Sequence, residues 1–143
     1  MARNFGNAVV VAILRSPLHG LLGQDFALIE FTGRSSGRAY CVPVNAFARE
    51  DGYLTLSRRE RTWWRNLRGR PGATLRHRGR ARPVQAQVID NLPEVAELLR
   101  LHLRTRPSHA RFLGISMGPD GEPDATQLGQ AAQDRVLIQL RPA

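Results

Sequence analysis

Residues 26–38 have the sequence Phe-Ala-Leu-Ile-Glu-Phe-Thr-Gly-Arg-Ser-Ser-Gly-Arg, a short apolar run followed at once by a polar turn that contains two glycines. The apolar part, 26–31, is β-prone and short, which predicts a well-buried strand. Residues 39–48 predict a second strand, in which Pro43 indicates an edge or a bulge. Because so short a turn folds one strand back on the other, we expect an antiparallel hairpin.

The same hairpin pattern continues along the chain. Asp51-Gly52 is a hairpin turn signal, and Gly79 divides another pair of β-prone segments. Further strands are predicted over 53–57, 73–78, 81–89 and 135–141. Helices are predicted over 5–14, 62–69, 92–105 and 108–113, the clearest being 92–105, because Asn91 can cap it and Glu94 completes a capping box. The segment 114–134, rich in glycine, proline and acidic residues, predicts a loop.

About six mostly antiparallel strands with a few flanking helices indicate an α+β fold, and the hairpin connections favour a small barrel over a Rossmann sheet. The length of 143 residues suits a single domain over 1–143, with an N-terminal helix and turn over 1–22. No apolar run approaches the roughly 20 residues that span a bilayer, so we expect a cytoplasmic protein. The single cysteine, Cys41, excludes an internal disulfide.

The charge is the strongest compositional signal. All 21 basic residues are arginine, the formal net charge is +9, and residues 1–111 hold 19 arginines against 8 acidic residues. This balance predicts an anionic partner: nucleic acid, an acidic membrane, or a phosphorylated or carboxylated ligand. Residues 58–82, with ten arginines, could track phosphates. Nucleic acid nevertheless ranks last, because aromatic residues make up only 6% and form no stacking stripe along the predicted strands.

The turn from Thr32 to Arg38 is the first candidate for a binding site. Two glycines let the backbone N–H groups converge on an oxyanion, as in an anion-binding nest. The guanidinium groups of Arg34 and Arg38 add fork-shaped donors that match phosphate. A solvated hairpin turn is the alternative, since glycine, serine and arginine are ordinary turn residues.

The second candidate is residues 62–67, Thr-Trp-Trp-Arg-Asn-Leu, which hold both tryptophans. Adjacent helical positions point about 100° apart, so we expect one indole in the core and the other lining a cleft or a subunit contact. Asn66 is typical of a cap or a backbone clamp. The four histidines are scattered without metal-ligand spacing, and we expect no metal. If the protein is an enzyme, a bound cofactor would supply the chemistry.

Four motifs, in this order, resemble those of a known family. They are residues 16–19 (Ser-Pro-Leu-His), 31–38 (Phe-Thr-Gly-Arg-Ser-Ser-Gly-Arg), Pro43-Val44, and 63–67 (Trp-Trp-Arg-Asn-Leu). They are similar to motifs of the deazaflavin-dependent nitroreductase family, the flavin and deazaflavin oxidoreductases of actinobacteria. The resemblance covers residues 9–90 well and the later helix more loosely. It implies a split β-barrel close to the FMN-binding folds, with coenzyme F420 in a groove beside the barrel.

The resemblance also implies residue roles. The turn would hold the phosphate and carboxylate tail of F420, and the ring would lie against barrel strands. The implied cofactor-binding residues are Arg34, Ser35, Ser36, Gly37, Arg38, Pro43, Val44, Ser57, Arg58, Trp64 and Asn66. The reduced deazaflavin would pass a hydride to a small hydrophobic acceptor: a quinone, a nitro compound or an activated alkene. Tyr40 or Tyr53 would be the catalytic proton donor, with water as the alternative.

The sequence departs from the family pattern at Ser35, where members often carry lysine, and at Tyr40, where they often carry arginine. Arg58, Arg59 or Arg61 could offset the lost tail contacts. The departures also allow a second interpretation, a non-catalytic split-barrel protein that binds FMN or another flavin, haem or an apolar ligand.

The apolar N-terminal helix has three alternative fates. It would pack on the barrel, form a homodimer contact, or act as a flap over the acceptor pocket that also touches a membrane surface. Arg3 and Arg15 flank this segment, where anionic headgroups could attract them.

Overall fold

The computed structural model describes residues 25–69 and 72–143; the N-terminal helix and turn expected over 1–22 lie outside this range. The elements, in chain order, are β1 (Phe26–Thr32), β2 (Ala39–Arg49), β3 (Gly52–Arg58), the 3-10 helix η2 (Trp63–Leu67), β4 (Gly72–His77), β5 (Arg80–Ile89), α2 (Leu92–Thr105), the 3-10 helix η3 (Pro107–Leu113), α3 (Ala125–Asp134) and β6 (Arg135–Pro142). All six predicted strands and the helix over 92–105 are confirmed to within two residues at each end.

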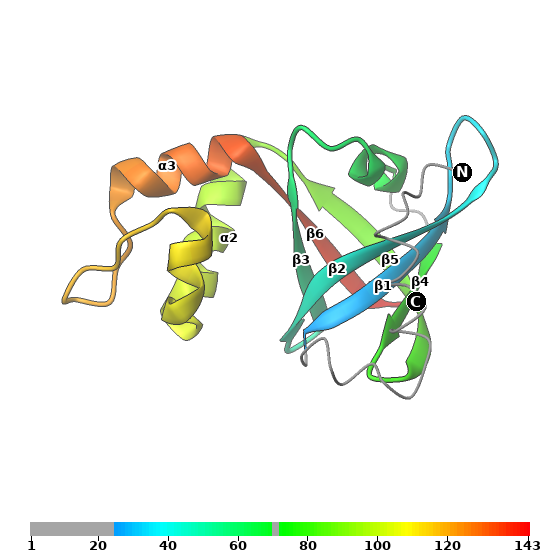
Figure 1. Ribbon diagram of the computed structural model, residues 1–143, viewed down its shortest axis with the longest axis horizontal. Helices are drawn as coiled ribbons and strands as arrows, with labels where there is room; N and C mark the ends of the chain where they lie inside the picture. Colours follow the sequence, from blue (N-terminus) through cyan, green and yellow to red (C-terminus); the bar gives the residue numbers. More distant parts are fainter. Residues whose placement is uncertain (1–24, 70–71) are drawn as a thin grey trace. The chain divides into compact units, whose positions relative to one another are not determined.

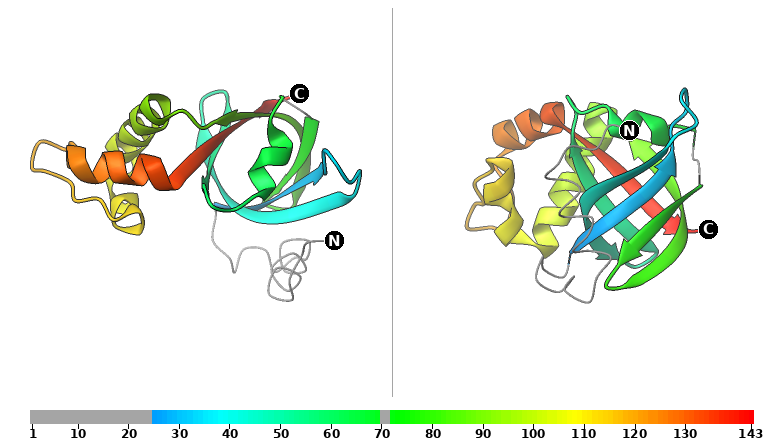
Figure 2. Two further views of the ribbon diagram at one scale, coloured as in Figure 1. Left: turned by 90° about the horizontal axis from the view of Figure 1, so that it is seen from above. Right: turned by 45° about the vertical axis from the view of Figure 1, so that its right-hand side comes forward.

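The six strands form a closed barrel in the order β1-β2-β3-β6-β5-β4 (Figure 1). Strand β1 pairs antiparallel with β2 on one side and with β4 on the other. In the left view of Figure 2 the strands close into a ring. The predicted α+β fold, a split β-barrel with mostly antiparallel strands, is therefore confirmed.

The strand register defines the inner face of the barrel. In β5, Val84 is buried whereas its neighbours Pro83 and Gln85 are exposed, so the even-numbered residues of β5 project inward. Directly paired residues project from the same face. Leu75 pairs with the inward Arg82, and Ile29 pairs with Leu75. Phe31 lies on the same face of β1 as Ile29 and pairs with Tyr40, so these residues also face inward. The inward positions of the first four barrel strands include Ala27, Ile29, Phe31, Tyr40, Val42, Val44, Ala46, Tyr53, Thr55, Leu75 and His77.

Strand β3 carries polar residues on its inner face. Thr55 is fully buried, and its Oγ1 donates to the carbonyl of Asn45 at 2.6 Å. Ser57, two residues further along, is 5% exposed. Leu54, on the opposite face, is also buried, so this strand is covered on both sides. Tyr53, Thr55 and Ser57 alternate with Leu54 and Leu56 along β3, and the more polar of these two sides points into the barrel.

Contacts divide the described chain into two compact units. The barrel unit contains the described residues up to Ser57, together with 61–88 and 138–143; the second unit contains 58–60 and 89–137. In the second unit α2 packs on α3, and both helices bury apolar residues. The predicted cap of α2 is confirmed, because Asn91 Oδ1 accepts from the Glu94 N–H at 3.0 Å. No helix among the described residues is both long enough and apolar enough to cross a membrane.

The loop predicted over 114–134 is wrong for its last ten residues, which form α3. Asp124 caps this helix, with its Oδ1 accepting from the Gln127 N–H at 2.9 Å. Leu128, Ala131 and Ala132 are buried at helical spacing. Because most residues of this segment are polar, the sequence suggested a loop. The three buried residues nevertheless form a narrow apolar stripe, and packing against α2 covers it.

Arg59 closes the C-terminal end of α3, where β6 follows without a loop. Its Nε donates to the Gln133 carbonyl at 3.0 Å, and its Nη2 donates to the carbonyls of Arg135 at 2.9 Å and Ala132 at 3.3 Å. Its backbone N–H donates to the Asp134 carbonyl at 2.8 Å. One guanidinium thus satisfies carbonyls that the helix end leaves without intrahelical partners.

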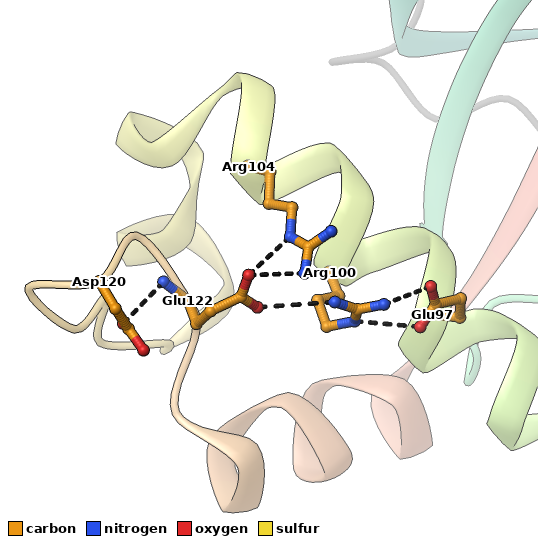
Figure 3. Close-up of polar contacts among 5 residues, drawn as sticks. All are labelled: Glu97, Arg100, Arg104, Asp120 and Glu122. Carbon is orange, nitrogen blue, oxygen red and sulfur yellow. Dashed lines mark hydrogen bonds and ion pairs between the residues drawn. The ribbon is translucent and has the colours of Figure 1, made fainter.

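Ion pairs neutralise the arginines of α2 within the second unit (Figure 3). Arg100 donates to Glu97 at 3.0 Å through Nε, and its hydrogen bonds hold the pKa of the Glu97 carboxyl below its ordinary value. Arg104 Nε donates to Glu122 Oε1 at 2.7 Å, and Arg100 lies 3.6 Å from the other Glu122 oxygen. The backbone N–H of Glu122 is itself bonded to Asp120.

Asp124→Ala removes the cap of α3 and leaves the Gln127 N–H without its acceptor. We expect the free energy of unfolding to fall by about 1 kcal/mol, measured by urea titration followed by far-UV circular dichroism. Asp124→Asn keeps the oxygen acceptor and should unfold close to the wild-type midpoint. Equal midpoints for the alanine variant and the wild type would contradict this role of Asp124.

Candidate functional site

The turn after β1 lies at one end of the barrel (Figure 1). The Gly33 N–H donates to the Arg38 carbonyl at 2.8 Å, and the Gly37 N–H donates to the Gly33 carbonyl at 3.0 Å. Gly37 has a φ of +67°, a left-handed conformation that glycine adopts at no steric cost. Figure 1 shows this turn beside η2, at the barrel end opposite the β4–β5 hairpin.

Asn66 fastens the turn to η2. Its Oδ1 accepts from the Arg34 N–H at 3.0 Å, while its Nδ2 donates to the Trp63 carbonyl at 3.1 Å. The Arg34 guanidinium also reaches the Arg65 carbonyl, at 3.4 Å. The backbone clamp predicted for Asn66 is confirmed, and it connects two sequence motifs that lie about 30 residues apart.

Three aromatic side chains, Phe31, Tyr40 and Trp63, form an aromatic cluster next to the turn. Phe31 and Tyr40 stack with ring centroids 5.6 Å apart, and Trp63 lies 6.2 Å from Phe31. Gly33 makes this packing possible, because a Cβ there would come within 2.6 Å of both the Tyr40 ring and Ser36 Oγ. Ser36 Oγ and Tyr40 Oη are 3.4 Å apart, so the ring hydroxyl reaches the turn.

The two tryptophans have different environments, as predicted. Trp64 is 2% exposed, and the guanidinium groups of Arg65 and Arg68 lie 5.5 and 5.0 Å from its ring centroid. Trp63 is only half-buried. Of the two indoles, Trp63 therefore offers surface to a ligand, whereas Trp64 offers almost none.

Most of the backbone N–H groups of the predicted nest are already bonded within the described structure. The N–H groups of Gly33, Arg34, Gly37 and Arg38 are all bonded within the turn or to Asn66, the last of them accepted by Ser36 Oγ at 3.2 Å. In the described structure, the N–H groups of Ser35 and Ser36 have no acceptor. The guanidinium groups available to an anion are the exposed ones of Arg34, Arg38 and Arg65, none of which has a carboxylate partner among the described residues.

The other predicted cofactor-binding residues are spread over different surfaces. Val44 points into the barrel, and Pro43, next to it, points outward. Ser57 is buried inside the barrel. Arg58 belongs to the second unit, where it lies 3.8 Å from Glu60. Arg59, considered as a substitute tail contact, is engaged with the carbonyls at the end of α3.

The structure separates the two predicted catalytic tyrosines. Tyr53 pairs with Ala48, eight residues along β2 from Tyr40, which corresponds to about 26 Å at the rise of a β-strand. Arg82 Nη1 donates to Tyr53 Oη at 3.2 Å, and the His77 ring meets the Tyr53 ring edge-on at 5.3 Å. Only Tyr40 lies at the turn, so the two tyrosines cannot serve one small substrate.

Sequence reasoning missed one polar pair. His102 of α2 is 1% exposed, and its Nε2 lies 2.9 Å from His109 Nδ1 of η3. The seven-residue separation crosses the end of α2, so no helical periodicity signals the contact. Within the described ranges no group of three or more His, Cys, Asp or Glu residues is placed to hold a metal ion.

The sequence of residues 14–114 matches the model of the F420H(2)-dependent quinone reductase family. The chain belongs to this family. The match spans the turn, η2 and most of the barrel, and therefore includes every residue of the candidate site. Among curated proteins, none matches the sequence of this family member at a significant level.

Solved structures show the fold in more distant proteins. A domain-swapped dimer is 14% identical with a TM-score of 0.53, and 94% of each chain is covered. The haem storage protein HutZ from Vibrio cholerae is 13% identical with a TM-score of 0.52, with 96% of this chain and 90% of HutZ covered. An F420 reductase is 18% identical with a TM-score of 0.48, with 92% and 91% covered. The likeness to the first two concerns the fold alone, and the TM-score of the third is too low to support even that.

Gly33→Ala tests the close packing of Tyr40 on the turn. The added Cβ would push the ring or Ser36 aside, and we expect the free energy of unfolding to fall by about 1–3 kcal/mol in a urea titration. Gly72→Ala is the matched control, since a Cβ at that position meets nothing within 4 Å. A Gly33→Ala variant as stable as the control would show that the turn does not depend on this contact.

Proposed function

We propose that this protein is an F420H2-dependent oxidoreductase that transfers a hydride from the reduced deazaflavin to a quinone. Membership of the F420H(2)-dependent quinone reductase family supports the cofactor and the reaction type. The observation that carries the proposal is the set of three exposed arginines, Arg34 and Arg38 of the turn and Arg65 of η2, on two segments that Asn66 joins next to the aromatic cluster. Nitro compounds and activated alkenes are the other electron-poor acceptors that this chemistry can reduce.

The donor set of the turn fits the anionic tail of F420. Guanidinium groups bind phosphate and carboxylate oxygens through paired N–H donors, and those of Arg34, Arg38 and Arg65 have no competing carboxylate in the described chain. The N–H groups of Ser35 and Ser36 and the Ser35 hydroxyl add neutral donors. Because Asn66 fixes the turn before any ligand arrives, less conformational freedom is lost on binding.

F420H2, when bound, supplies the hydride. The chain itself supplies binding, orientation and a route for a proton. The half-buried Trp63 and Tyr40 rings offer an apolar surface next to the basic turn, which suits a flat, uncharged acceptor. Tyr40 Oη can donate a proton or a hydrogen bond to the reduced oxygen, and Ser36 Oγ, 3.4 Å away, can hold the hydroxyl in one orientation.

A homodimer is part of this proposal. The chain shares its fold with a protein described as a domain-swapped dimer, which makes self-association of the barrel a reasonable expectation. Sedimentation equilibrium of the full chain tests it, and a monomer at all concentrations would remove this part without affecting the rest.

Titration with oxidised F420 at low salt, followed by tryptophan fluorescence, tests the function directly. We expect saturable quenching, dominated by Trp63. Arg34→Gln and Arg38→Gln should each weaken binding by about tenfold or more, because each removes a charge-assisted hydrogen bond. Arg111→Gln is the matched control, an exposed arginine of the second unit whose partner is the Phe112 ring.

Turnover is then measured with F420H2 and a water-soluble quinone, with a nitroaromatic compound and an activated alkene as competing acceptors. Oxidation of the coenzyme that depends on quinone supports the proposal. Absence of binding at high micromolar coenzyme would exclude it. A visible absorption band from co-purified haem or flavin would instead favour a non-catalytic binding protein.

A further inference from the structure

The barrel end opposite the turn carries its own polar cluster. Tyr53 of β3, His77 of β4 and Arg82 of β5 all project inward at this end, as the strand register requires. Arg82 Nη1 donates to Tyr53 Oη at 3.2 Å, and the Tyr53 and His77 rings meet edge-on at 5.3 Å. Arg80 pairs directly with His77 in the β4–β5 ladder, so its side chain projects from the same face.

The arginines of the β4–β5 hairpin differ in whether a described carboxylate neutralises them. Arg76, on the outer face of the same hairpin, is paired with Glu30 at 2.7 Å. In contrast, neither Arg80 nor Arg82 has a carboxylate partner among the described residues, and the only described acceptor of Arg82 is Tyr53 Oη. Residues 72–89 contain no acidic side chain at all. Among the described residues only Tyr53 Oη accepts from Arg82, so four of the five Arg82 N–H donors have no acceptor there.

We propose that Tyr53, Arg80 and Arg82, with His77, form a second binding site, for a ligand that carries a phosphate or carboxylate group. Guanidinium groups are the donors that such oxyanions prefer, and here two of them lie at one barrel end, one of them held by a tyrosine hydroxyl. Tyr53 fixes the Arg82 side chain from across the barrel end and so reduces the conformational freedom lost when the anion binds.

This site is separate from the coenzyme site. Along β2 the two barrel ends are eight residues, or about 26 Å, apart. The inference does not rest on the proposed function, because it uses no residue of the turn or of η2. It also gives Tyr53 a role other than proton donor to the acceptor.

The two tyrosines allow each barrel end to be observed separately. The full chain is labelled with carbon-13 in the tyrosine rings, and Tyr40→Phe assigns the two signals. Inorganic pyrophosphate is titrated in low salt, and citrate is titrated in parallel as the carboxylate probe. We expect a saturable shift of the Tyr53 signal with one or both probes. A response to pyrophosphate alone indicates a phosphate-bearing ligand, and a response to citrate alone indicates a carboxylate.

Variants distinguish binding of the anion at this site from its non-specific attraction to a basic protein. Arg82→Gln, and Arg80→Gln as a second variant, should weaken the Tyr53 response by about tenfold or more, whereas Arg111→Gln should leave it unchanged. Far-UV circular dichroism establishes that each variant is folded. Arg34→Gln should affect only a response at Tyr40. A Tyr53 signal that does not shift, or that shifts equally in the wild type and both Arg80 and Arg82 variants, overturns the proposal.

Discussion

The pairing of Phe31 with Tyr40 is the constraint on which the rest of the barrel unit depends. It sets the β1–β2 register, and through that register it decides which side chains enter the barrel. It also places two aromatic rings under the turn, so that Trp63 has a surface to pack on and η2 has a fixed position. A slip of one residue would turn Tyr40 outward and remove the support of the basic turn at the same time.

The sequence was sufficient to predict the strands and the helix α2, because their local signals agree with their tertiary environment. Buried and exposed residues alternate around Val84 in β5, as in the sequence pattern. Asn91 and Glu94 form the capping box that indicates the start of α2. Helix α3 was not predicted because its apolar side is small, consisting of Leu128 and two alanines. Gly129 also lowers the helix propensity of this segment. The one local signal of this helix is Asp124, a capping residue whose Oδ1 accepts from the N–H of Gln127, three residues later.

The candidate site could be predicted in its location but not in its donors. Composition alone indicates that residues 33–38 form a basic turn. Which N–H groups stay available depends on Asn66, some 30 residues later, and on the Ser36 hydroxyl, neither of which a local pattern specifies. The same holds for Tyr53, whose partners Arg82 and His77 come from other strands and are known only once the barrel closes.

Arg59 has a consequence for the order in which the chain folds. Its guanidinium and the carbonyl of Arg135 are 76 residues apart in sequence, so the last turn of α3 is completed by a contact of high sequence separation. During synthesis, β3 and Arg59 emerge well before the carbonyls that they will meet. The junction of α3 and β6 is therefore expected among the last parts to become ordered, and closure of the barrel by β6 must wait for it.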